Sequence, residues 1–249
     1  MEVNGYKIKP KADLCGANLK EADLSDVNLA NARLIGANLE STNFINADLS
    51  GANFTRAYLR GADLTGANLT GADMTEADLT IATFDSVCIV GFNLTGARLA
   101  GTNFHNTNLS GAMLRGVDLT AAGFIGQNLS KVDLIDSHQK TFSGDEENRP
   151  SFYQANLTEA YLNNADLTGA DLGGANLTGA NLMKTNLFKA NLSGASLNDA
   201  TLINTSLMNA DLSGADLSGA DLSGANLFGA DLSDVNLTGT TMPDGTIHE

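Results

Sequence analysis

Large apolar residues recur at every fifth position through most of the chain. The period runs unbroken from Leu14 to Leu134 and resumes from Leu157 to Met242. Two positions before each large residue stands a small one, usually Ala, and the position between them is mostly Asp or Asn. The two positions that follow are mostly Ser, Thr, Gly or charged. The chain is therefore a long tandem array of the unit Ala-Asp/Asn-Leu-Ser/Thr-Gly.

This period fits neither an α-helix nor a straight β-strand. Five helical residues advance about 140° beyond a full turn, so successive Leu side chains would spread around the whole axis. In a straight strand, five steps place successive Leu side chains on opposite faces. A short extended piece followed by a turn keeps the small and the large residue of every unit on one inward face, and Gly, Asn and Ser tolerate such turns. The pattern predicts an all-β parallel β-solenoid whose coils stack about 4.8 Å apart.

The aromatic residues favour four sides per coil. Phe44, Phe84, Phe104 and Phe124 differ by multiples of 20, so a coil of 20 residues stacks them in one column, with Leu64 between the first two. A coil of 15 residues would scatter them over three sides. Four sides are therefore the preferred interpretation.

Individual units resemble a known family. Residues 62–66, 67–71 and 215–219 read ADLTG, ANLTG and ADLSG, which is similar to the pentapeptide repeat family, and the ending at residues 242–249 is similar to that of cyanobacterial members. The resemblance implies a right-handed quadrilateral β-helix. At four units per coil we expect about 11 coils.

The pattern also predicts how the chain is organised. Residues 1–13 lack a full repeat and are the expected N-terminal cap, and residues 14–134 form a first repeat block. Residues 135–151 are expected to be an insertion loop, because the distance from Leu134 to Leu157 is not a multiple of five. Residues 152–242 then form a second block of the same domain. Pro243 lacks an N–H and begins a C-terminal tail, residues 243–249.

Charge and composition exclude several functions. The chain of 249 residues has 14 Lys and Arg against 29 Asp and Glu, a formal net charge of −15. Direct nucleic-acid binding and docking on anionic membranes both rely on Lys and Arg, so neither is expected. No run of 18 apolar residues and no signal-peptide pattern occurs, and two cysteines are no disulfide framework. We expect a cytoplasmic protein.

Residues that could support catalysis do not converge. His105, His138 and His248 fall in different columns of a 20-residue coil, and Cys15 and Cys88 lie more than three coils apart, so we expect neither a metal site nor a disulfide. Glycine motifs for dinucleotides and phosphates are missing. A solenoid filled by its own Leu and Ala offers no pocket for a substrate. The prediction is a protein without cofactor and without enzymatic activity.

Two surfaces are candidates for contacts. Phe188, Met208 and Phe228 directly follow a large residue and are spaced by 20, and Met183 and Ile203 form a similar pair on an adjacent side. We call these five residues the apolar stripe; it is a candidate dimer or partner interface, or its side chains simply pack against each other. The second candidate surface is the insertion loop, with possible contacts at His138, Lys140, Phe142, Asp145, Glu146, Glu147 and Arg149.

Two functions remain open at this point. The first is a non-catalytic scaffold that presents side-chain ladders and one loop to a protein partner; a regulatory role and a homodimer are both open within this function. The alternative is DNA mimicry, in which the acidic surface binds or inhibits a type II topoisomerase such as gyrase, as resemblance to the quinolone-resistance members implies. The acidity also has a structural explanation, because Asp and Asn alternate in predicted columns and Asn separates carboxylates that would repel.

Overall fold

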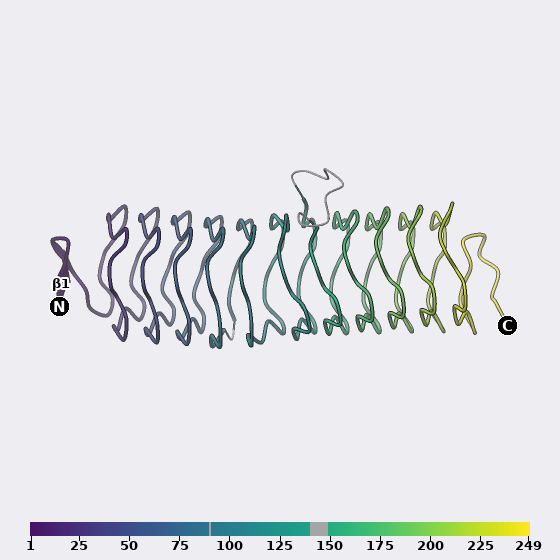
Figure 1. Ribbon diagram of the computed structural model, residues 1–249, viewed down its shortest axis with the longest axis horizontal. Helices are drawn as coiled ribbons and strands as arrows, with labels where there is room; N and C mark the ends of the chain where they lie inside the picture. The colour runs from purple at the N-terminus through teal and green to yellow at the C-terminus, as the bar shows by residue number, and fades with distance from the viewer. Residues whose placement is uncertain (90, 140–148) are drawn as a thin grey trace. The chain divides into compact units, whose positions relative to one another are not determined.

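The computed structural model describes residues 1–89, 91–139 and 149–249. They form two compact units, unit 1 (Met1–Asp118) and unit 2 (Leu119–Glu249), and each is described by itself. In both units the chain winds into a succession of coils (Figure 1). None of the described residues belongs to a helix long and apolar enough to cross a membrane.

The coils of unit 1 are joined by parallel β-bridges with a spacing of 20 residues. The bridges run from Asp13 with Arg33 to Arg98 with Asp118. On most sides the N–H of the large residue donates to a carbonyl of the next coil, as from Leu14 to Arg33 at 2.7 Å, and the N–H of the bridging residue donates backwards, as from Arg33 to Ala12 at 2.9 Å. Four five-residue sides therefore make one coil, as the phenylalanine spacing predicts.

The interior of unit 1 consists of the small and large residues of each repeat. Leu64 is fully buried, and Ile89, with 5% of its surface exposed, is the most exposed large residue of the period in this unit. Phe84 and Phe104 belong to successive coils and stack with ring centroids 5.0 Å apart. The inward positions assigned from the sequence are confirmed by this burial.

Each corner depends on a residue with positive φ at the last position of the unit. Gly36 (φ 63°) and Asn46 (φ 57°) are typical, since Gly and Asn tolerate the left-handed region. Ile81 (φ 56°) is the exception, because β-branched residues are strained there. The Ile81 side chain is 55% exposed. It lies between Gly61 and Gly101 of the same column, and a Cβ on Gly101 would lie 3.2 Å from Ile81 Cγ2.

Replacing Ile81 by Asn should raise the free energy of unfolding of unit 1 by about 1 kcal/mol, because Asn adopts this backbone conformation at lower cost. Asn31→Ile, at an equivalent corner (φ 58°), is the reciprocal variant and should lower it. Chemical denaturation followed by circular dichroism measures both. A lower midpoint for Ile81→Asn would show that the apolar contacts of Ile81 outweigh its backbone strain.

A short hairpin covers the first coil of unit 1. Strands β1 (Glu2–Val3) and β2 (Tyr6–Lys7) pair antiparallel, and these are the two regular strands of the described residues, because each solenoid side contributes a single bridging residue. The Tyr6 hydroxyl accepts the N–H of Asn18 at 3.3 Å, and Ile8 is buried. The hairpin thus closes the apolar interior at this end of unit 1.

Unit 2 has the same coil, with one change of spacing. Gly123 bridges Ser151 and Asn128 bridges Asn156, pairs that are 28 residues apart, and the spacing returns to 20 from Ser151 with Asp171 onwards. One coil therefore contains eight additional residues. Phe124 and Phe152, from the coils on either side of this change, stack with centroids 5.1 Å apart.

The coil of unit 2 extends into the segment that the sequence assigns to the insertion. Leu119 N–H donates to His138 at 2.8 Å, and Asp166 N–H donates to Ser137 at 2.8 Å. Ser137 is buried. Gln139 stands five positions after Leu134, where the period places a large apolar residue. On the far side, the Pro150 carbonyl accepts the N–H of Asp171 at 3.0 Å. Residues 140–148 lie outside the described part. The domain boundaries and the count of about 11 coils stay predictions.

The last coil of unit 2 is only partly closed. The tail folds back so that Ile247 forms an antiparallel bridge with Thr241, and Gly239 N–H donates to His248 at 2.7 Å. This contact covers one side. On the other sides Leu227, Leu232 and Leu237 are half-buried, unlike the fully buried Leu217 of the preceding coil.

Candidate functional site

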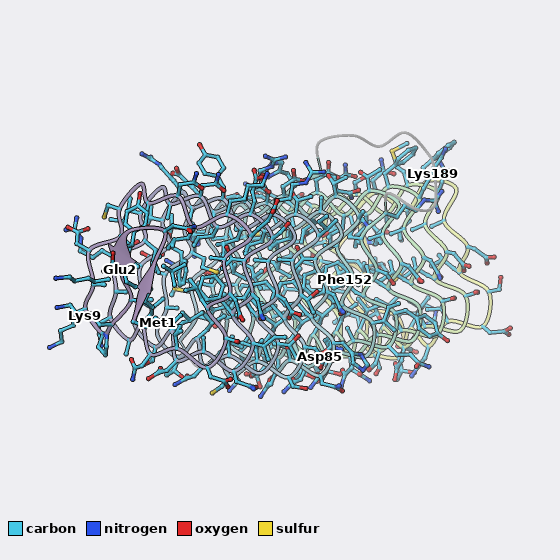
Figure 2. All side chains as sticks on the ribbon, turned by 60° about the vertical axis from the view of Figure 1, so that its left-hand side comes forward. Met1, Glu2, Lys9, Asp85, Phe152 and Lys189 are labelled. Atoms are coloured by element: carbon cyan, nitrogen blue, oxygen red, sulfur yellow. The ribbon has the colours of Figure 1, made fainter. Side chains whose placement is uncertain are left out.

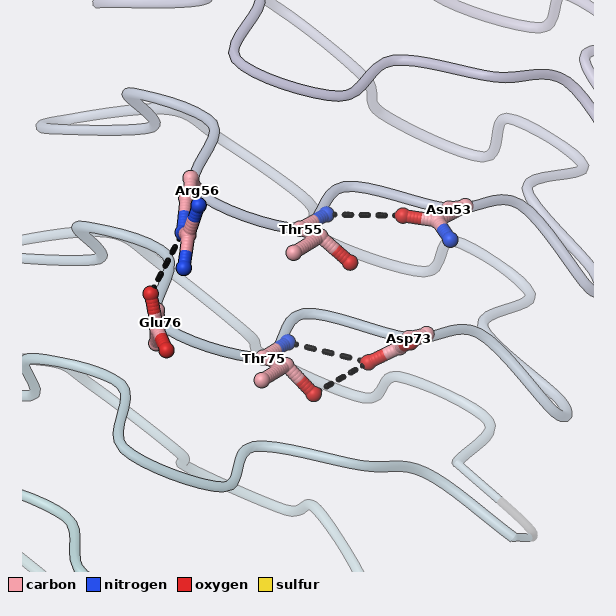
Figure 3. Close-up of polar contacts among 6 residues, drawn as sticks. All are labelled: Asn53, Thr55, Arg56, Asp73, Thr75 and Glu76. Carbon is pink, nitrogen blue, oxygen red and sulfur yellow. Dashed lines mark hydrogen bonds and ion pairs between the residues drawn. The ribbon is translucent and has the colours of Figure 1, made fainter.

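The outward surface of each unit is built by the Asp or Asn between the two inward residues. Its side-chain oxygen accepts the N–H two positions later, as in Thr55 to Asn53 at 2.9 Å and Thr75 to Asp73 at 3.0 Å (Figure 3). The Thr75 hydroxyl donates to the same oxygen at 2.6 Å. The consensus Asp/Asn-Leu-Ser/Thr therefore describes a local turn that satisfies backbone and side-chain groups together.

Asn side chains connect these carboxylates between coils. Asn43 donates to Asp23 at 3.1 Å, and Asn93 donates to Asp73 at 3.2 Å. In unit 2, Asn191 donates to Asp171 at 2.9 Å. Much of the acidity is therefore part of the coil structure, which agrees with the structural explanation of the Asp and Asn columns.

Hydrogen bonds and ion pairs keep several carboxylates ionised. The hydroxyl and N–H of Ser25 lower the pKa of Asp23, and the Arg56 guanidinium, 2.5 Å from Glu76, lowers the pKa of that carboxyl. Arg98 pairs with Asp78 at 2.9 Å. Cations therefore interrupt the negative surface of unit 1.

The apolar stripe lies on two neighbouring corners of unit 2. The N–H of Lys189 donates to Met208 and that of Asn209 donates to Phe228, both at 3.0 Å, which places Phe188, Met208 and Phe228 on successive coils. Phe188 and Met208 are half-buried and Phe228 is 75% exposed. A matching bond from Lys184 to Ile203 at 3.0 Å places Met183 beside Ile203, both half-buried. Phe188, Met208 and Phe228 thus share one corner, and Met183 and Ile203 share the next. That these residues form an interface stays a prediction.

Of the predicted loop contacts, the structure describes His138 and Arg149. His138 is exposed, and Arg149 borders a hollow of about 390 Å³ that Ser151, Gly169, Asp171 and Asn191 also line. Lys140, Phe142, Asp145, Glu146 and Glu147 lie outside the described residues. The sequence did not predict this hollow. The period of five breaks between Leu134 and Leu157, so Arg149 could not be assigned to a column of the coil.

Groups that could support metal or thiol chemistry are dispersed. The described residues contain no group of three or more His, Cys, Asp or Glu side chains that could hold a metal ion. Cys15 and Cys88 are both exposed free thiols, and burial together with the hydrogen bond to Asp13 raises the pKa of Cys15. A raised pKa disfavours the reactive thiolate.

Comparison with known families decides what kind of protein this is. The sequence model described as pentapeptide repeats (8 copies) matches residues 11–44, 42–80, 89–120, 151–187, 185–224 and 205–242. The chain belongs to the pentapeptide repeat family. Pentapeptide repeat proteins of known structure are right-handed quadrilateral β-helices, in agreement with the 20-residue bridges. No enzyme family is indicated.

Several solved pentapeptide repeat structures are similar to this chain. HetL from the cyanobacterium Nostoc sp. strain PCC 7120, a pentapeptide repeat protein involved in heterocyst differentiation regulation, is 34% identical; the match covers 98% of this chain and 94% of HetL with a TM-score of 0.52. A pentapeptide repeat protein of the Arabidopsis thaliana thylakoid lumen is 30% identical over 42% of this chain and 66% of that chain, with a TM-score of 0.32. QnrB1, a plasmid-mediated fluoroquinolone resistance protein, is 17% identical over 88% of both chains with a TM-score of 0.38. No curated protein sequence matches significantly.

Proposed function

We propose that this pentapeptide repeat protein is a non-catalytic, cytoplasmic scaffold that binds a regulatory protein partner through the apolar stripe of unit 2. The main support for this proposal is the arrangement of the stripe: five apolar side chains occupy two neighbouring corners, and Phe228 is 75% exposed. Apolar side chains gathered on an otherwise polar surface are typical of protein interfaces. The similarity to HetL, which is involved in regulation, supports a regulatory partner.

Charged residues around the stripe would orient the partner. Lys189 Nζ lies 5.3 Å from the ring centroid of Phe188, so this corner combines an aromatic face with a cation. His138 and Arg149 flank the insertion in the same unit and are candidates for further contacts. An aromatic centre with a polar rim is the usual arrangement of an interface that binds a protein rather than a small molecule.

Serine substitutions test this proposal. Phe188→Ser, Met208→Ser and Phe228→Ser combined should weaken binding of a partner captured from native cell extract and then purified by about tenfold or more, because the apolar contact is removed. Ile35→Ser, Ile45→Ser and Ile135→Ser combined is the matched control, since these half-buried residues occupy the same repeat position elsewhere. Calorimetry measures the affinity, and circular dichroism checks that both variants fold. Equal affinity of the stripe variant and the wild-type protein would reject the stripe as the interface.

DNA mimicry is the second candidate, and the charge of unit 2 favours it. From residue 160 to the end of the given sequence, Lys184 and Lys189 are the only Lys or Arg among many carboxylates. The stripe variant separates the two candidates, because it leaves every carboxylate in place. Salt-sensitive inhibition of DNA supercoiling by gyrase that survives the serine substitutions supports mimicry, and no inhibition at a large excess of protein rejects it.

A further inference from the structure

The last coil of unit 2 presents an unpaired edge. Within the described residues, no backbone carbonyl accepts the N–H of Leu227, Leu232 or Leu237, whereas the N–H of Leu217 donates to Asn236 at 2.9 Å. The same three Leu side chains are half-buried, and the tail covers only the side of Thr241. An edge of this kind, with apolar side chains behind it, is a template for pairing with another chain.

This edge also contains negative charge. Asp231 bridges Asp211 directly, and among the described bridges this is the one pair of two carboxylates. In the other described bridges Asp pairs with Asn, Ser, Thr, Tyr or Arg, as at Asp171 with Asn191. The hydroxyl and N–H of Ser233 lower the pKa of Asp231, so it stays ionised at neutral pH. Asp234 is exposed on the next corner. A cationic group is the chemistry that this end lacks.

The hairpin of unit 1 provides that chemistry. Lys7 and Lys9 are exposed, and Glu2 is the single acidic residue before Asp13. Figure 2 shows the Lys9 side chain projecting away from the ribbon. Strands β1 and β2 contain two residues each, which is about the length of one solenoid side, where a single residue forms the bridge. A hairpin strand could therefore pair along one side of a coil.

We propose that two copies of this protein associate head to tail, the hairpin of one copy docking on the open last coil of unit 2 of the other. Lys7 and Lys9 then face Asp231 and Asp234, and a hairpin strand pairs with the free edge over the half-exposed Leu residues. Contact between two C-terminal ends is disfavoured, because Asp231 and Asp234 of both copies would meet. A head-to-tail contact does not close on itself, so it propagates into chains of copies.

Sedimentation velocity of the purified protein, residues 1–249, tests the proposal without any partner. The sedimentation coefficient should rise with protein concentration, and the association should weaken as salt screens the charges. Lys7→Glu with Lys9→Glu should reduce the association constant by about tenfold or more. Arg60→Glu with Lys184→Glu makes the same change of net charge at other exposed positions and should leave the association unchanged.

A second pair of variants changes the last coil of unit 2, on which the hairpin is proposed to dock. Asp231→Lys with Asp234→Lys should reduce the association constant by about tenfold or more. Asp136→Lys with Asp199→Lys, at corners with φ of 57°, is the control and should leave the association unchanged. The two association-deficient variants each retain one intact end. Mixed together, they should associate again, because the intact hairpin of one variant meets the intact last coil of the other, and the exchanged charges at the second contact, Glu against Lys, also attract.

Three results would overturn the proposal: a monomer at all concentrations, an association that Lys7→Glu with Lys9→Glu does not affect, or no association in the mixture. Circular dichroism of each variant shows whether a loss of association reflects unfolding. Because the apolar stripe is unchanged in these variants, failure here leaves the proposed scaffold function intact, and failure of the stripe variant leaves self-association intact.

Discussion

Replacing Leu64 by Asp should destabilise unit 1 by about 4 kcal/mol or more, which is enough to unfold its central coils. Leu64 is fully buried in the apolar interior, where a carboxylate finds neither water nor a cation. The neighbouring coils contribute only small and large apolar side chains at this point. Thermal denaturation followed by circular dichroism, together with hydrogen exchange of unit 1, measures the loss.

The control for this variant needs an exposed position in the same repeat. Arg60→Asp is suitable, because Arg60 is exposed and directly follows a large residue. Thr65 is less suitable, since its hydroxyl donates to Asp63 at 2.5 Å and a second carboxylate there would repel the first. We expect Arg60→Asp to unfold close to the wild-type protein. Equal melting of Leu64→Asp and Arg60→Asp would contradict the inward assignment of the large residues.

Replacing Phe152 by Ala should cost unit 2 about 3–5 kcal/mol. Phe152 is fully buried and stacks on Phe124 with an angle of 16° between the rings, across the coil that contains the eight additional residues. Its N–H donates to Asp171 at 2.7 Å, so the backbone bond survives the substitution while a cavity opens beside Phe124. Denaturant unfolding of the protein, residues 1–249, measures the effect.

Phe152→Leu is the matched control, since Leu172 occupies the same position in the next coil. The loss should then fall below about 1.5 kcal/mol, because most of the volume is retained. A loss as large as that of the Ala variant would mean that the ring stack itself, rather than the filled volume, stabilises this coil.

The repeat could be predicted from the sequence because every unit repeats the same physical solution. A period of five excludes a helix and a straight strand, and the small and large residues identify the inward face. The apolar stripe followed from the same arithmetic, since residues 20 apart share a column. The period alone does not fix the domain boundaries, because it does not show where the coil ends.

Other features were not predictable, because they depend on contacts outside the repeat. Gln139 stands where a large apolar residue is expected, so the sequence gives no sign that it continues the coil; its amide donates to carbonyls of Asp166 and Thr168 at 3.3 and 3.0 Å. The open edge at Leu232 depends on how far the tail folds back. The strained corner at Ile81 is visible only from its φ angle.

The 20-residue bridging distance governs how such a chain tolerates changes of length. Within one unit, adding or deleting 20 residues adds or removes one whole layer and leaves every column in line. A change of five residues keeps the inward face but turns all later layers by a quarter of a revolution, so a surface such as Phe188 and Met208 would point in a new direction with no loss of buried area. The number of repeats before a surface therefore sets both its position along the solenoid axis and the direction it faces, independently of the residues that form it.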